Sequence, residues 1–229
     1  MIPYLADLLR ISICTLVLAG VISSSVLAEE NLFKLEPSDE SERDQSFLEF
    51  RNQFQQAVSF REPERLVTMV DFAVLNGVLA PNGMKAFAER WNIDSIESPI
   101  WEVLDSIMKL GGGFVRSNRG VQYCAPYVFT HFPSELDPKK YVAIIDKQVP
   151  LKAEADFTSD TKEILSYDIV ELLNSEDIKN PQIEWLQVKL HDGLNGFVSR
   201  SAVRSPRDYQ ACFLLRKQKW RMISLFSQF

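Results

Sequence analysis

The chain has 229 residues, of which 46% are hydrophobic, and a formal net charge of −6 at pH 7. A chain of this length can bury one good hydrophobic core or two small ones. Its acidic balance argues against a nucleic-acid partner, because phosphate binding needs a concentrated basic surface.

Residues 1–28 are predicted to be a secretory signal peptide. One basic residue, Arg10, precedes a mainly apolar run over residues 11–22, and the segment ends in Val26-Leu27-Ala28. Small residues before a cleavage point are typical of such signals. The alternative is an uncleaved membrane anchor, but the apolar run has about half of the roughly 20 residues that a spanning helix needs. We therefore expect cleavage near Ala28, a periplasmic or secreted protein, and no transmembrane anchor after cleavage.

Residues 29–45 form an acidic segment with few large apolar side chains. Such a composition buries too little surface to offset the entropy of ordering the chain. The segment is therefore predicted to be a disordered leader.

The region 46–141 is predicted to be helical and to end in a hairpin. Phe47, Phe50, Phe54 and Val58 recur at helical spacing. Further helices are predicted from Pro63 through Val70, over residues 82–91, and from Ser98-Pro99 to the glycines at 111–113. The three glycines could suggest a phosphate loop, but such a loop follows a strand and opens a helix. A helix end that leads into a strand is the expected reading, followed by a hairpin turning near residues 118–120.

The C-terminal half is predicted to be rich in β-strands. Short strand-like segments follow one another over residues 142–204, and residues 205–229 read as a last hairpin that turns near residues 217–219. Helices followed by strands indicate an α+β protein.

Residues 142–204 resemble the bacterial SH3 (SH3b) domain family. The family pattern is matched by "VPLK" at 149–152, "LSYDIVELL" at 165–173 and "WLQVKLHDGLNGFVS" at 185–199, the last of these being the most specific. Pro150 and Lys152 stand where the family usually has Asn and Arg. The resemblance implies an exported bacterial SH3-domain protein, and the predicted fold is α+β: an N-terminal helical region with flanking β-hairpins plus a small SH3-like β-barrel. The element order also fits a single α+β unit of the NTF2 or cystatin-like kind with the barrel inserted in it.

Trp185, Tyr167 and Phe197 are the predicted ligand-binding residues. Strand alternation puts Leu186 and Val188 on the core face and Trp185 on the opposite face. The resemblance implies that this tryptophan borders a partly exposed aromatic groove shared with Tyr167 and Phe197, where extended peptides bind. The alternative is that Trp185 is covered by the loop over residues 174–184 or by the helical region, and has only a structural role.

Cys124 and Cys212 are the cysteines that remain after signal cleavage. An exported compartment permits a disulfide between them, and two buried thiols are the alternative.

No active site is predicted. His131 and His191 sit in no recognisable motif, and Glu102 with Asp105 fits a solvated helix face better than a glycosidase pair. We expect no metal and no cofactor. The favoured function is a non-catalytic envelope protein whose barrel binds peptidoglycan, a peptide or a protein partner. The alternative is a cell-wall hydrolase, or a hydrolase accessory, acting through the helical region.

Overall fold

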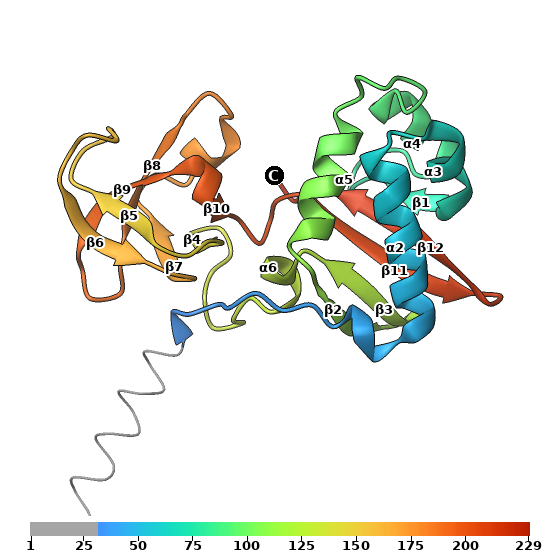
Figure 1. Cartoon of the computed structure of the whole chain (residues 1–229), viewed down its shortest axis with the longest axis horizontal. Coiled ribbons are helices and arrows are strands. Elements are labelled where there is room, and N and C mark those ends of the chain that lie inside the picture. Colours follow the sequence, from blue (N-terminus) through green and yellow to red (C-terminus); the bar gives the residue numbers. More distant parts are fainter. Residues whose placement is uncertain (1–31) are drawn as a thin grey trace, which may run out of the picture. The chain divides into compact units, whose positions relative to one another are not determined.

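The computed structural model describes residues 32–229, so the predicted signal peptide and its cleavage near Ala28 lie outside the described residues. The described chain combines helices with two β-sheets, which agrees with the predicted α+β class (Figure 1). Its α-helices are α2 (Gln45–Ser59), α3 (Pro63–Met69), α4 (Met84–Trp91), α5 (Ile100–Lys109) and α6 (Tyr127–Thr130). Among residues 32–229, no helix is both long and apolar enough to cross a membrane.

The first sheet has five strands in the order β1-β12-β11-β3-β2. β1 runs parallel to β12, and all other neighbours are antiparallel. The strands are β1 (Val70–Leu75), β2 (Gly113–Ser117), β3 (Gly120–Ala125), β11 (Gln210–Arg216) and β12 (Lys219–Phe226). The C-terminal hairpin therefore completes a sheet that starts before residue 126, and the strands of the second sheet lie between β3 and β11 in the chain.

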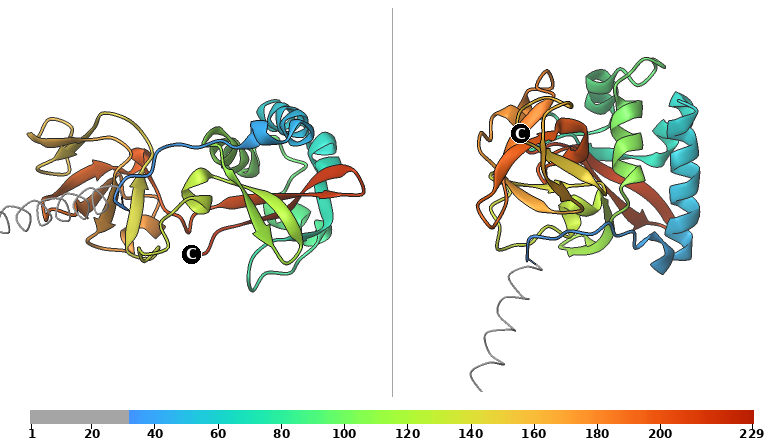
Figure 2. Two further views of the ribbon diagram at one scale, coloured as in Figure 1. Left: turned by 90° about the horizontal axis from the view of Figure 1, so that it is seen from below. Right: turned by 60° about the vertical axis from the view of Figure 1, so that its left-hand side comes forward.

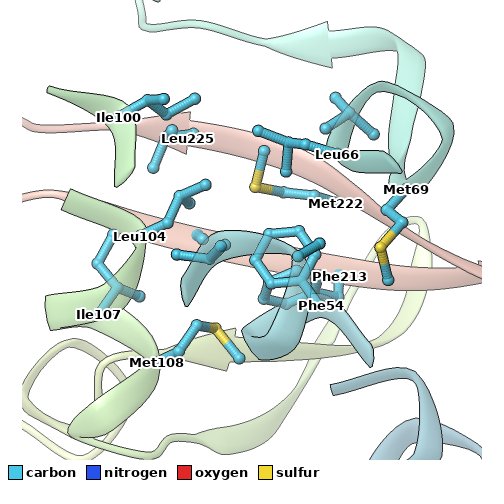
Figure 3. Packing of buried hydrophobic residues seen from close by; sticks show 14 of the residues in the cluster. Phe54, Leu66, Met69, Ile100, Leu104, Ile107, Met108, Phe213, Met222 and Leu225 are labelled. Atoms are coloured by element: carbon cyan, nitrogen blue, oxygen red, sulfur yellow. The ribbon is translucent and has the colours of Figure 1, made fainter. Parts of the chain in front are cut away.

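Helices α2 to α5 supply apolar side chains to one face of the five-stranded sheet (Figure 2). The stripe predicted for the first helix is in place, because Phe47 and Phe54 are fully buried in α2. The helix begins where the Asp44 side chain accepts hydrogen bonds from the backbone N–H groups of Ser46 and Phe47, at 2.9 and 3.1 Å. Figure 3 shows how side chains of α2, α3 and α5 pack against side chains of the sheet. The helical residues are Phe54, Leu66, Ile100, Leu104 and Ile107, and the sheet residues are Phe213, Met222 and Leu225.

The strand β1 was not predicted. The helix expected to run through Val70 ends at Met69, and Val70 starts β1, where it lies opposite Met222 of β12. The sequence over residues 70–75 carries no helix breaker. The conformation of residues 70–75 is decided by pairing with a strand about 150 residues away in the sequence. Such tertiary pairing outweighs the local propensity of the residues.

The glycines after α5 end the helix, as predicted. Gly111 has φ +67°, and a Cβ on this residue would lie 2.7 Å from the carbonyl oxygen of Ser38. A Cβ on Gly112 would lie 2.1 Å from the carbonyl oxygen of Cys124. These glycines thus allow two backbone segments to pass close to the start of β2.

The acidic leader is ordered from Leu35 onward, which corrects the predicted disorder over this part of residues 29–45. Leu35 is buried, and the Glu40 carboxylate accepts a 2.8 Å hydrogen bond from the backbone N–H of Phe114 in β2. The Asp39 carboxylate accepts a hydrogen bond from the Tyr123 hydroxyl at 2.8 Å and pairs with Arg51 at 2.8 Å. The composition of the segment misleads because a few specific polar contacts hold it, together with one buried apolar side chain, that of Leu35.

Cys124 and Cys212 form a disulfide. They lie directly opposite each other on the neighbouring strands β3 and β11, on the face of the five-stranded sheet that points away from α2 to α5. Buried Leu214 and Ile223 surround them. The disulfide joins two segments that are separated by 88 positions in the sequence.

The second sheet contains seven strands, in the order β10-β4-β7-β8-β9-β5-β6. Leu151, Leu186, Val188 and Val198 are fully buried between its strands. Within the described residues β6 and β10 are the two ends of this order, so the strand pairing does not close a barrel. The strands are β4 (Tyr141–Ile144), β5 (Val149–Lys152), β6 (Thr161–Leu165), β7 (Ile169–Leu172), β8 (Trp185–Lys189), β9 (Asn195–Ser199) and β10 (Val203–Arg204).

Candidate binding surface

Trp185 begins β8, on the face of the seven-stranded sheet opposite the core. Leu186 and Val188 are fully buried, whereas Trp185, Gln187 and Lys189 are partly or fully exposed. The alternation predicted for this strand is therefore present. It leaves a half-buried indole on the outer face of the sheet.

The aromatic partner of Trp185 is Phe157, which the sequence did not predict. The two ring centroids are 4.7 Å apart in an edge-to-face arrangement, a favourable geometry for aromatic rings. Phe157 nevertheless remains 70% exposed. An aromatic ring that packs on one neighbour and still faces water offers a contact surface for a ligand.

The loop between β5 and β6 holds Phe157 in place through its neighbours. The Asp156 carboxylate accepts hydrogen bonds from the backbone N–H and the hydroxyl of Thr158, at 2.7 and 2.9 Å. These hydrogen bonds lower the pKa of Asp156. At the base of the loop, the buried Lys152 ammonium donates to the carbonyl oxygen of Ser159 at 2.6 Å. The loop is thus fixed on both sides of the exposed ring.

An open pocket of about 500 Å³ lies beside Phe157. Pro181 and Ile183 give it further apolar surface, and Glu184 gives it a carboxylate; Ser199, Arg200 and Ser201 complete the lining. The guanidinium of Arg200 donates to the carbonyl oxygens of Asp177 and Ile178, so this side chain holds the long loop before β8. Trp185 supports Phe157 from the side and is not itself a lining residue of the pocket.

Phe197 shares the outer face with Trp185. It lies opposite Gln187 across the β8–β9 pair, and Trp185 lies opposite Ser199. The two aromatic residues are therefore diagonal neighbours on adjacent strands.

The structure does not bring Tyr167 into this group. Tyr167 precedes β7 and has φ +59°, and its ring lies 5.7 Å from the Lys147 ammonium. β7 pairs with β8 through Leu172 and Val188, so Trp185 lies toward the other end of these strands. Phe157 takes the place that the prediction gave to Tyr167. The signal that could have found it is a single aromatic residue in the polar loop "EADFTSD".

Three of the residues considered for catalysis make local contacts in the structure. Glu102 pairs with Arg61 at 3.9 Å and Asp105 with Lys109 at 2.7 Å, as expected for a solvated helix face. The His131 ring contacts the neighbouring Thr130 hydroxyl at 2.8 Å. Over residues 32–229, no group of three or more His, Cys, Asp or Glu side chains is arranged to hold a metal ion.

Comparisons with protein-family models, with curated proteins and with solved structures found no match for this chain. What the surface binds must therefore be inferred from its side chains.

Proposed function

We propose that this chain is a non-catalytic exported binding protein of the cell envelope. Its seven-stranded sheet would act as an SH3b-like module that holds peptidoglycan, a peptide or a protein partner beside Phe157 and Trp185. The observation that carries the proposal is the largely exposed Phe157 ring, packed on Trp185 at the rim of an open pocket. Aromatic residues of this kind are common at the centre of binding surfaces.

The chemistry of the pocket favours an extended peptide, either free or as part of the cell wall. Phe157, Pro181 and Ile183 offer apolar contact to side chains of the ligand. The hydroxyls of Ser199 and Ser201, which lie 2.9 Å apart, can donate to and accept from a peptide backbone. Glu184 favours a ligand with an amino group.

The predicted export supports an envelope role. The signal-like pattern of residues 1–28 predicts secretion. The disulfide between Cys124 and Cys212 fits an oxidising compartment, because such bonds rarely persist in a reducing cytosol.

Sedimentation with purified sacculi tests the proposal. The wild-type protein should pellet with the sacculi, and Phe157→Ala should weaken the binding about fivefold or more, because loss of a central aromatic contact costs over about 1 kcal/mol. Its melting temperature should stay nearly unchanged, since the ring is exposed. Phe60→Ala is the matched control, because Phe60 is also about two-thirds exposed (69%) but lies at the end of α2.

Two further measurements separate the possible ligands and roles. Sacculi stripped of stem peptides by an amidase should no longer bind if the peptide is recognised, and continued binding would identify the glycan. Trp185→Ala should also reduce binding. A loss of about 3 kcal/mol or more in the free energy of unfolding for Trp185→Ala would instead assign that residue to packing. Binding that is unaffected by both variants would refute the proposed site.

A further inference from the structure

The turn of the β11–β12 hairpin carries an unusual concentration of positive charge for this protein. Arg216, Lys217, Lys219 and Arg221 lie within six positions, although the chain as a whole has a formal net charge of −6. We call these four residues the basic tip. Figures 1 and 2 show that the turn extends beyond the neighbouring helices and β1. The charge therefore stands at a projecting point of the five-stranded sheet.

The geometry of the basic tip does not favour the stability of the hairpin. Arg216 and Lys219 lie directly opposite each other across the two strands, and like charges in this position repel. Lys217 and Gln218 form the turn with φ values of +48° and +62°. Turns of this kind prefer Asn-Gly, and a left-handed conformation costs other residues about 1 kcal/mol each. Unfavourable local features that persist in this way point to a function.

Only part of the positive charge is neutralised within the protein. Arg216 pairs with the buried Asp71 at 3.3 Å. Arg221 donates to the carbonyl oxygen of Thr68 at 2.7 Å, which holds the guanidinium in place, and no carboxylate of the described residues forms an ion pair with it. Lys217 and Lys219 are exposed, and within residues 32–229 neither ammonium forms an ion pair.

Apolar surface adjoins the charge. An open pocket of about 670 Å³ is lined by the basic tip on one side and by apolar residues that include Val67, Phe72 and Met84 on the other. Phe72 is 80% exposed. The surface is thus amphipathic, with cations at its outermost point and an aromatic ring beside them.

An extended anionic surface fits these features better than a small anion or an added peptide strand. The four cations are spread along both strands and the turn, and two of them are already held by protein groups, Arg216 by Asp71 and Arg221 by the carbonyl oxygen of Thr68. Strand addition at β1 is obstructed, because the carbonyl oxygen of Val74 already accepts from the backbone N–H of Gly83 at 2.7 Å. The N–H of Ala73 is likewise bonded to Asp71 at 2.9 Å. We propose that the basic tip, together with Phe72, docks this protein onto a membrane surface that bears anionic phospholipid headgroups.

Co-sedimentation of the signal-free protein with phospholipid vesicles tests the proposal. Phosphatidylcholine vesicles that contain phosphatidylglycerol should bind the protein, and vesicles of phosphatidylcholine alone should not. Each lysine near an anionic surface contributes about fivefold to binding, so Lys217→Gln combined with Lys219→Gln should weaken binding about 30-fold. Rising salt should have a similar effect, because it screens the attraction.

Two controls make the result specific. Lys139→Gln with Lys140→Gln removes the same charge from exposed positions elsewhere and should leave vesicle binding unchanged. Phe72→Ala should weaken vesicle binding several-fold without changing the melting temperature, because its ring is exposed. The melting temperature of the double lysine variant should stay the same or rise, since a repulsion is removed.

Three results would overturn the proposal. They are equal binding to neutral and anionic vesicles, full binding by the double lysine variant, and binding of a soluble polyglutamate peptide with no binding to anionic vesicles. The last result would indicate an acidic protein partner. Phe157→Ala should leave vesicle binding intact, so failure of this proposal is distinguishable from failure of the proposed function.

Discussion

The attachment of the acidic leader through Asp39 gives the most direct test of the fold. The Asp39 carboxylate accepts hydrogen bonds from the Tyr123 hydroxyl at 2.8 Å and from the backbone N–H of Ser41 at 3.0 Å, and it pairs with Arg51 at 2.8 Å. Partial burial raises the pKa of Asp39, but these hydrogen bonds and the nearby guanidinium outweigh it and lower the pKa. Burial of the Tyr123 ring, followed by the charge of Asp39, raises the pKa of that hydroxyl, which therefore remains a donor.

The magnitude follows from these contacts. A hydrogen bond to a charged group contributes about 1.5–3 kcal/mol, and we take about 1.5 because Asp39 is 36% exposed. The ion pair with Arg51 adds about 1 kcal/mol, a value near the upper end for pairs that reach solvent. Asp39→Ala should therefore lower the free energy of unfolding by about 2.5 kcal/mol, and Tyr123→Phe by about 1.5 kcal/mol.

A double-mutant cycle isolates the Asp39–Tyr123 contact. Urea unfolding followed by tryptophan fluorescence should give a coupling energy of about 1.5 kcal/mol between the two substitutions. Glu36→Ala is the matched control, because it removes an exposed carboxylate from the same segment and should change stability by less than about 0.5 kcal/mol. A coupling energy below about 0.5 kcal/mol would show that this contact does not hold the leader.

Three further results are expected. Reduction of the Cys124–Cys212 disulfide should lower the free energy of unfolding by about 4.5 kcal/mol in the loop-entropy treatment, given the separation of 88 positions. Denaturation with and without reductant measures this change, and a difference below about 1 kcal/mol would contradict the pairing. Gly112→Ala should lower the melting temperature strongly, because its Cβ would overlap the Cys124 carbonyl, whereas Gly193→Ala meets no atom within 4 Å and should cost only the strain of φ +94°. Hydrogen bonding, first from the Ser46 hydroxyl, lowers the pKa of Asp44, so its contribution is present at neutral pH and is lost as pH falls below about 4. A pH titration of stability should show this loss in the wild type and a smaller one in Asp44→Ala.

The amino-acid sequence alone determined the elements whose signals are local. The spacing of Phe47, Phe54 and Val58 predicts α2, because a helix repeats its buried face every three to four residues. The alternation of Leu186 and Val188 with Trp185 predicts β8 and the outward position of the tryptophan, because successive side chains of a strand point to opposite faces of the sheet. The glycines after α5 predict the end of that helix.

Tertiary structure decided the features that depend on residues far apart in the chain. Residues 70–75 become a strand because β12 lies beside them, and Cys124 meets Cys212 because β3 and β11 are neighbours. The Asp39 carboxylate accepts a hydrogen bond from the hydroxyl of Tyr123, which lies 84 positions away in the sequence. Trp185 packs against Phe157 and does not lie near Tyr167. The register between β8 and its neighbouring strands decides which loops lie at each end of β8, and a single chain segment cannot set that register by itself. Local periodicity thus identifies which face of an element is buried, but only the assembled sheets determine which side chains meet on the exposed face.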